Sequence, residues 1–173
     1  AGQYSTEMNI GTLAGWNTSS VTDMSGMFRE AGATVTNFTL NLAGWDVSAV
    51  TSMYEMFYNT AYTSTSFSIG NLDSWMPSNV ETMNSMFRGA GYTTGTFTIG
   101  DISGWNVTNV IDMRFMFLEA GYSSSVFNLG NIGNWALGST TKDLAYMFCN
   151  AGNSATAWYV GDLGGWDTSG VTD

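Results

Sequence analysis

A tryptophan returns about every thirty residues along the chain, and this period constrains the fold more than any other feature. Repeats of this length cannot bury their apolar side chains alone, so they stack on their neighbours as a solenoid. We expect one domain over residues 1–173, with about six coils, that starts and ends within a repeat. The tryptophans of the period are Trp16, Trp45, Trp75, Trp105, Trp135 and Trp166.

Each repeat contains a short apolar alternation next to a glycine. In the fourth copy Phe97, Ile99 and Ile102 are apolar, and Gly100 lies among them. Apolar residues two apart, β-branched or aromatic and bounded by glycine, predict a short half-buried strand. We expect the copies to pair in parallel, one per coil, with a spacing of roughly 4.8 Å.

A second apolar pattern follows each tryptophan. In the first copy a Ser or Thr precedes Val21, Met24, Phe28 and Ala31, which are three and four residues apart. This spacing predicts a short helix with the hydroxyl residue as its N-cap and with the glycines at 32, 91, 121 and 152 at its end. Such a short helix is held only by packing. An extended segment or a tight 3₁₀ turn stays open as an alternative for part of it.

Two sets of large apolar side chains recur at fixed positions and are the predicted core. Identical side chains stacked on one another are what a solenoid buries, at roughly 1.5–3 kcal/mol for each fully buried side chain. One set is the tryptophan column. The other is a Met-Phe column made of Met27, Phe28, Met56, Phe57, Met86, Phe87, Met116, Phe117, Met147 and Phe148.

A Ser/Thr tract precedes each predicted strand. Stacking would turn it into two columns of hydroxyl groups on one side, which is the candidate contact face. Three interpretations stay open: a solvated face, a face that carries O-linked sugar, and a regular hydroxyl array that binds ice. The residues are Thr34, Thr36, Thr63, Thr65, Thr93, Ser123, Ser125, Ser154 and Thr156.

Charge and composition exclude several classes of function. The net charge is −10, and the cations are Arg29, Arg88, Arg114 and Lys142, so the basic surface needed to bind nucleic acid or an anionic membrane is absent. No apolar run approaches the roughly 18 residues of a membrane-spanning helix. Without histidine and with the lone Cys149, the chain lacks nucleophile pairs and thiolate zinc sites, so we expect no enzyme activity, metal or cofactor. Candidate N-glycosylation acceptors are Asn17, Asn37 and Asn106.

The string from Phe97 to Phe117 carries a resemblance to a known family. It contains Gly-Asp-Ile-Ser-Gly-Trp at 100–105 and Val-x-Asp-Met-x-x-Met-Phe at 110–117. It resembles the repeat of BspA-like leucine-rich-repeat surface proteins, in the branch of unknown function first noted in mycoplasma lipoproteins. The resemblance covers the whole chain, although each repeat here is about five residues longer, within the Ser/Thr tract. It implies a leucine-rich-repeat-like solenoid that is secreted or lies on a cell surface and adheres to host or matrix.

Together these patterns predict a right-handed, leucine-rich-repeat-like solenoid with a parallel β-sheet. Each coil would hold one short strand and one short helical segment. We expect a secreted or cell-surface structural and adhesive protein that continues as the same solenoid or associates end to end into filaments, because an open coil exposes core and unpaired strand edge. A monomeric adhesin that binds glycan or matrix, and an ice-binding solenoid, are the alternatives.

Overall fold

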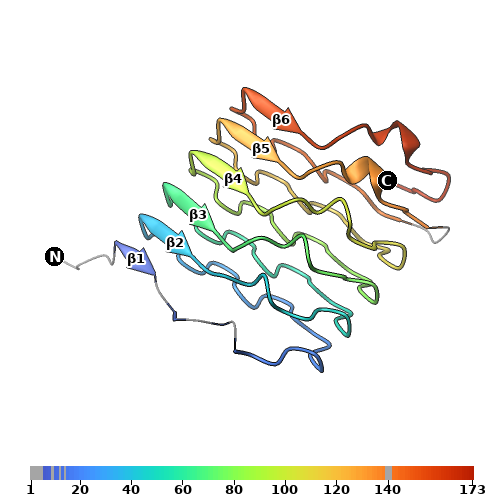
Figure 1. Ribbon diagram of the computed structural model, residues 1–173. Coiled ribbons are helices and arrows are strands. Elements are labelled where there is room, and N and C mark those ends of the chain that lie inside the picture. The colour runs from blue at the N-terminus through green and yellow to red at the C-terminus, as the bar shows by residue number, and fades with distance from the viewer. Residues whose placement is uncertain (1–5, 9, 12, 14, 139–141) are drawn as a thin grey trace.

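The computed structural model describes residues 6–8, 10–11, 13, 15–138 and 142–173. Six short strands lie side by side in one row and succeed one another along the chain (Figure 1). They are β1 (Glu7–Met8), β2 (Asn37–Thr39), β3 (Ser66–Ser68), β4 (Thr96–Thr98), β5 (Val126–Asn128) and β6 (Ala157–Tyr159). The predicted repeating architecture with one short parallel strand per coil is confirmed.

All strand pairs are parallel, and equivalent residues face each other. Phe38 pairs with Phe67 between β2 and β3, and Phe97 pairs with Phe127 between β4 and β5. The ladders form two three-stranded sheets, β1-β2-β3 and β4-β5-β6. The coils still stack where these sheets meet, because the rings of Phe67 and Phe97 lie 5.4 Å apart.

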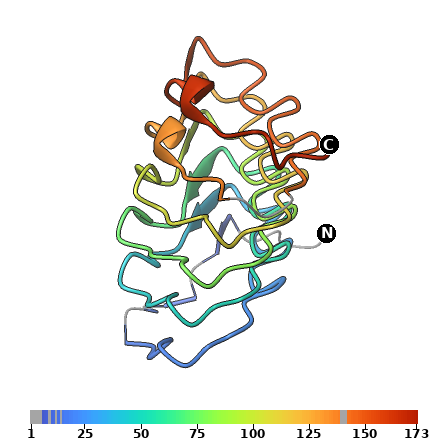
Figure 2. The same ribbon diagram turned by 90° about the vertical axis from the view of Figure 1, so that its right-hand side faces the viewer.

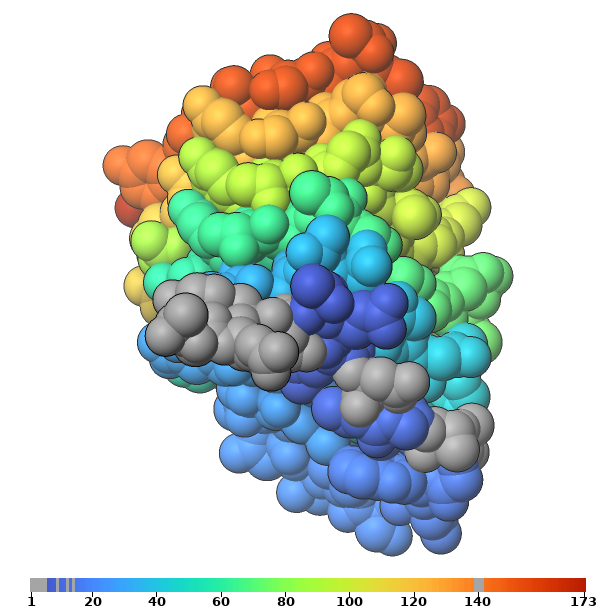
Figure 3. Space-filling model, turned by 90° about the vertical axis from the view of Figure 1, so that its left-hand side faces the viewer, coloured from blue at the N-terminus to red at the C-terminus, as the bar shows by residue number. Residues whose placement is uncertain are grey.

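A second column of parallel bridges runs along the side of the coil away from the strands. It joins Asp23, Ser52, Thr82, Asp112 and Asp143, one residue from each successive coil. The view in Figure 2 shows the coils as stacked loops, and the space-filling view in Figure 3 shows them as successive colour bands. The interior between the strands and the bridges is filled by the recurring apolar side chains.

The prediction of a helical segment after each tryptophan is wrong. The segments that follow the bridges are runs of tight turns, and the helices among the described residues are two single 3₁₀ turns, η1 (Ile132–Asn134) and η2 (Leu163–Gly165). In the second coil the backbone N–H groups of Met53, Glu55 and Phe57 donate to carbonyls of the next coil. Those of Met56 and Tyr58 donate three residues back within the coil. Alternate N–H groups therefore bond between coils, which an α-helix does not allow.

These turns require left-handed backbone at regular positions. Glu55, Asn59 and Ala61 have φ values of 53°, 49° and 54° in the second coil. Phe115 and Tyr146 adopt 58° and 55° at the position of Glu55 in later coils. Such values cost L-residues roughly 1–2 kcal/mol each. The hydrogen bonds to neighbouring coils offset this cost, so the conformation repeats without glycine at every position.

The glycines predicted to end the helix do have left-handed backbone. Gly91 and Gly121 have φ values of 55° and 53°. A side chain would also collide with the core there, since a Cβ on Gly121 would lie 2.5 Å from Phe97 Cβ. These glycines therefore end the run of turns and let the chain pass close to the phenylalanine of the preceding coil.

Candidate functional site

The tryptophans form a stacked column. Neighbouring rings from Trp75 to Trp166 have centroids 6.1–6.4 Å apart and are within 12° of parallel. Trp45, Trp75, Trp105 and Trp135 are buried and Trp166 is partly buried, as predicted for a core. Trp16 is the exception, because 54% of it is exposed at the first coil. Its predicted burial is wrong because no preceding coil of the described chain covers it.

Each indole of the column from Trp45 to Trp166 also makes a specific hydrogen bond. Trp105 Nε1 donates to the carbonyl of Leu72 in the preceding coil at 2.9 Å, and the same carbonyl accepts the backbone N–H of Trp75 at 3.1 Å. The pattern repeats for the other indoles from Trp45 to Trp166. A phenyl ring would fill only part of this space and could not donate the bond, so the position requires tryptophan.

The Met-Phe column is buried over most of its length. Phe28, Phe57, Phe87, Phe117 and Phe148 stack at 5.2–5.7 Å between centroids. The methionines Met56, Met86, Met116 and Met147 are buried as predicted. Met27 is 40% exposed, so its predicted burial is wrong, and Phe148 is only partly buried. Both exceptions lie in the first and last copies of the column, where fewer neighbours cover them.

All nine residues of the predicted contact face are exposed and lie in the tracts that precede the strands. Five of the nine donate their hydroxyl hydrogen within the molecule. Thr63 donates to Ala33 O at 2.8 Å, and Ser125 donates to Gly95 O at 3.0 Å. These bonds reach the preceding coil, so the five bonded hydroxyls face solvent as acceptors.

A third hydroxyl column, between the two predicted ones, escaped the sequence analysis. It consists of Ser64, Thr94 and Ser124, all buried. Ser64 Oγ donates to Val35 O at 2.5 Å, and Ser124 Oγ donates to Thr94 O at 3.0 Å. The alternation of the tract, with the middle position of Thr-Ser-Thr facing inward, was the signal that could have revealed it.

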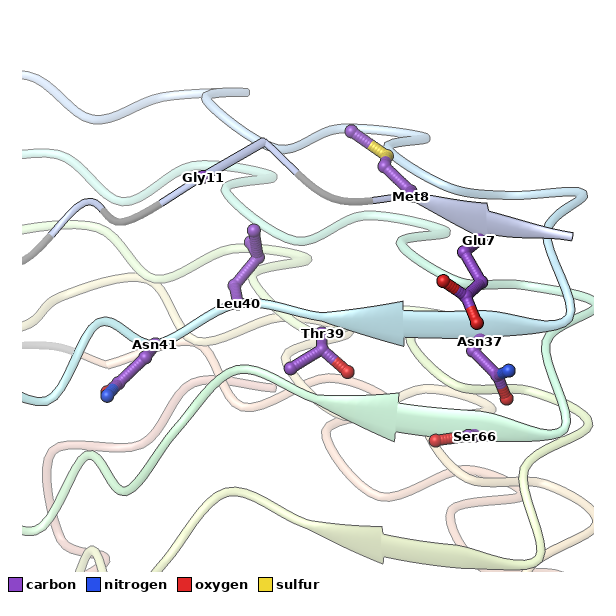
Figure 4. A pocket seen from close by; sticks show the side chains of 8 residues that line it. All are labelled: Glu7, Met8, Gly11, Asn37, Thr39, Leu40, Asn41 and Ser66. Atoms are coloured by element: carbon purple, nitrogen blue, oxygen red, sulfur yellow. The ribbon is translucent and has the colours of Figure 1, made fainter. Parts of the chain in front are cut away.

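The outward side of the strands adds polar groups next to this face. Asn37, Ser66 and Thr96 occupy one outward position, and Thr39 and Thr98 the next. An open hollow lies near the start of the chain, where Glu7, Asn37 and Ser66 come from three neighbouring strands (Figure 4). The rigid strand row therefore presents a regular array of short polar side chains.

The three candidate glycosylation acceptors are exposed. The side-chain oxygens of Asn17 and Asn106 accept backbone N–H bonds from the residues two positions on, Ser19 and Thr108. Ser19 Oγ also donates to Asn17 Oδ1 at 2.7 Å. Their glycosylation stays a prediction.

Arg29 and Arg114 lie on the turn segments among acidic neighbours. Arg29 pairs with Glu55, and Arg114 pairs with Asp112 at 2.9 Å. Burial alone would raise the pKa of Asp112, but hydrogen bonds from Arg114 and Asn84 outweigh it and lower the pKa below the ordinary value. Acids and bases are therefore interspersed here, and the turn side offers no uniform basic surface.

Lys142 is a second feature that the sequence analysis missed. It is 1% exposed, and its ammonium donates to the carbonyls of Val107, Thr108 and Val110 in the preceding coil. The side chains of Asn79 and Asn109 donate to the carbonyls equivalent to that of Thr108, those of Ser48 and Ser78. Burial lowers the pKa of Lys142. The lysine thus continues a column of structural donors.

No candidate metal centre is found in the part of the chain that the structure describes. Within the described ranges no three His, Cys, Asp or Glu side chains gather closely enough to hold a metal ion, and Cys149 is free and exposed. Asp101 Oδ1 accepts the backbone N–H of Ser103 at 2.9 Å, as expected for a side chain that caps a bend. No helix in the described part of the chain is long and apolar enough to cross a membrane.

A known protein family matches the chain. No curated protein and no solved structure matches the chain. One family pattern matches residues 3–94 and again residues 59–173, which together span nearly the whole sequence. The chain therefore belongs to the family described as Mycoplasma protein of unknown function, DUF285.

Proposed function

We propose that the chain is a non-enzymatic structural and adhesive module of the cell exterior, built as a right-handed leucine-rich-repeat-like solenoid. The observation that supports this proposal is that its polar side chains form hydrogen bonds between successive coils. The indoles from Trp45 to Trp166, the hydroxyls of Ser64 and Ser124, and the ammonium of Lys142 donate to carbonyls of the preceding coil. The side chains that can donate hydrogen bonds thus stabilise the stack, and the stack presents a rigid polar face to solvent.

The hydroxyl face is the proposed adhesive surface. Thr65 and Ser125 are exposed on it, and their hydroxyls are fixed by bonds to the preceding coil at 3.3 and 3.0 Å. Fixed acceptors lose little conformational entropy on binding, which favours contact with the hydroxyl donors of glycans. Ice binding is less favoured, because the face is interrupted by Gly95, Val126 and Ala157.

End-to-end contact between coils is the proposed structural part. Trp16 is 54% exposed and Met27 40% exposed at one end, and Trp158 is 44% exposed at the other. Equivalent side chains in the middle of the molecule are covered by a neighbouring coil. Phe97, which occupies the position of Trp158 in an earlier coil, is buried in this way. A coil of the same kind would cover the exposed ones, whether it belongs to a longer chain or to another copy.

Two experiments on the purified 173-residue protein test the proposal. Sedimentation and electron microscopy should show association along the long axis that increases with concentration. Met27→Lys should abolish it, because it places a charge on the apolar end. Ile111→Lys is the matched control, because Ile111 is 48% exposed and lies away from both ends of the described chain. Equal association of both variants would contradict end-to-end contact.

A glycan array probed with the monomeric Met27→Lys protein tests adhesion. Binding that falls at least tenfold on Thr65→Lys, and not on Ile111→Lys, would support the hydroxyl face. Ice-crystal shaping without glycan binding would replace adhesion with the antifreeze alternative. Turnover of any small substrate would contradict the non-enzymatic assignment.

A further inference from the structure

Three tyrosines form the most closely stacked aromatic column of the described structure. The ring centroids of Tyr62 and Tyr92 are 4.6 Å apart, and those of Tyr92 and Tyr122 are 4.7 Å apart. The interplanar angles are 21° and 7°. The phenylalanine and tryptophan columns have wider spacings, from 5.2 Å upward. The phenol rings of successive coils therefore lie face to face.

The column lies at the edge of the molecule and not in its core. All three tyrosines are partly exposed, and each directly precedes an exposed residue of the hydroxyl face, Thr63, Thr93 or Ser123. Burial raises the pKa of Tyr62 and Tyr92, so both rings stay neutral phenols in their stack at physiological pH. The rings are therefore accessible to oxidation from solvent while the stack keeps them paired.

We propose that Tyr62, Tyr92 and Tyr122 are a site of oxidative cross-linking, in which a haem peroxidase with hydrogen peroxide joins neighbouring rings as dityrosine. Each phenol loses one electron and one proton to become a phenoxyl radical. The two radicals form a carbon–carbon bond between the positions ortho to oxygen, and the two ortho hydrogens move to the oxygens and restore the phenols. Hydrogen peroxide takes up the two electrons and two protons and becomes two molecules of water.

The stacked geometry determines which rings join. A radical formed on Tyr92 has a neighbouring phenol on each side at less than 5 Å, as the ring distances show. Tyr54 and Tyr146 are more exposed, at 43% and 66%, but their rings stack on no other tyrosine within the described residues. Links within one chain should therefore form in the column, whereas the exposed tyrosines should give links between chains.

Such a link would bind two coils whose tyrosines are thirty residues apart in sequence. The chain has a single cysteine, so no disulfide within the chain can do this. A cross-link between coils restricts the unfolded chain and should raise the midpoint of urea unfolding.

The test treats the folded protein with horseradish peroxidase and hydrogen peroxide and isolates the monomer band from a denaturing gel. We expect dityrosine fluorescence in that band, an intact mass lower by two hydrogens per link, and cross-linked peptides that contain residues 62 and 92 or 92 and 122. Tyr92→Phe keeps an aromatic ring in the stack but leaves the remaining phenols two coils apart. It should lower the monomer signal at least tenfold.

Tyr146→Phe is the matched control, and its monomer should keep the full signal. Tyr62→Phe should keep only the link between residues 92 and 122, which confirms the column order independently. The proposal is overturned if Tyr92→Phe monomer carries as much dityrosine as the wild type. It is also overturned if the wild type, with unchanged circular dichroism, links only between chains.

Discussion

Replacing one buried tryptophan by phenylalanine tests whether the indole column specifies the stack through hydrogen bonds as well as packing. Trp105 is 3% exposed, and its indole donates to Leu72 O at 2.9 Å. In Trp105→Phe that carbonyl keeps the backbone N–H bond from Trp75. It is therefore not left unpaired, and the loss is that of one net hydrogen bond, about 0.5–1.5 kcal/mol.

The smaller ring adds a packing cost. Trp105 stacks between Trp75 and Trp135 at 6.1 and 6.4 Å, and the neighbouring coils limit how far the site can collapse. Removing one ring of the indole should cost a further 1–2 kcal/mol or so, less than the roughly 3–5 kcal/mol of truncation to alanine. The free energy of unfolding should therefore fall by about 1.5–3.5 kcal/mol in all.

Urea unfolding followed by far-ultraviolet circular dichroism measures this change, since fluorescence would itself be altered by the substitution. Trp16→Phe is the matched control, because the Trp16 ring is 54% exposed, and it should change stability by less than about 0.5 kcal/mol. If Trp105→Phe costs no more than this control, the indole hydrogen bond and the ring packing do not hold the coils together as argued.

Three further substitutions test other columns by urea unfolding. Gly100→Ala should destabilise the protein by about 1–3 kcal/mol, since φ is 92° and the new Cβ would collide with the side-chain oxygen of Asn71 in the preceding coil. In the control Gly104→Ala the new Cβ meets nothing within 4 Å, so stability should not change. Equal effects of the two substitutions would contradict the steric argument. Ser64→Ala should cost about 1–3 kcal/mol because it removes a buried donor, whereas the exposed Thr65→Ala should cost less than about 0.5 kcal/mol; a reversed order would contradict the role of the inner hydroxyl column. Because the pKa of Asp112 is lowered in the folded protein, its ionised carboxylate stabilises the fold at pH values above the ordinary pKa of 3.8. This contribution to stability is lost as the pH falls through the lowered pKa of the folded state. Asp112→Asn should therefore lose less stability than the wild type between about pH 5 and about pH 2, and parallel pH profiles would contradict this.

The thirty-residue period was sufficient to predict the coils, the parallel strands and most of the core. Phe97 and Trp105 recur because each coil places them in the same environment, so one repeat predicts the others. The predicted burial was wrong for Trp16 and Met27, because burial in a stack depends on the neighbouring coil and not on the residue itself.

The helix was wrongly predicted because overlapping turns and an α-helix share the same apolar spacing. Met53, Met56 and Phe57 are three and four residues apart in either conformation. What differs is the destination of the N–H groups, and the pattern of apolar residues carries no information about that. The left-handed Glu55 and Phe115 gave no warning either, since neither is a residue type that favours positive φ.

The residues of the candidate contact face are exposed, as the stacked repeats predicted, but their chemistry was only partly predictable. The sequence placed the exposed hydroxyls of Thr63 and Ser125 on one side. It did not show that their hydrogens bond to Ala33 and Gly95 carbonyls, because which carbonyl of the preceding coil comes within reach depends on the backbone path. The same reason hid the carbonyl cluster around Lys142.

The direction of the side-chain hydrogen bonds bears on how such chains evolve. Among the described residues, bonds from a side chain to the backbone of another coil all run to the coil before it, as Trp105 and Thr63 illustrate. The donors of a duplicated repeat inserted at any point therefore meet matching carbonyl acceptors in the preceding coil. Its own carbonyls in turn accept the donors of the next coil. Gene duplication or loss could lengthen or shorten the molecule by whole units without altering a single neighbouring residue, whereas a reversed or partial unit would break the bonds at both seams.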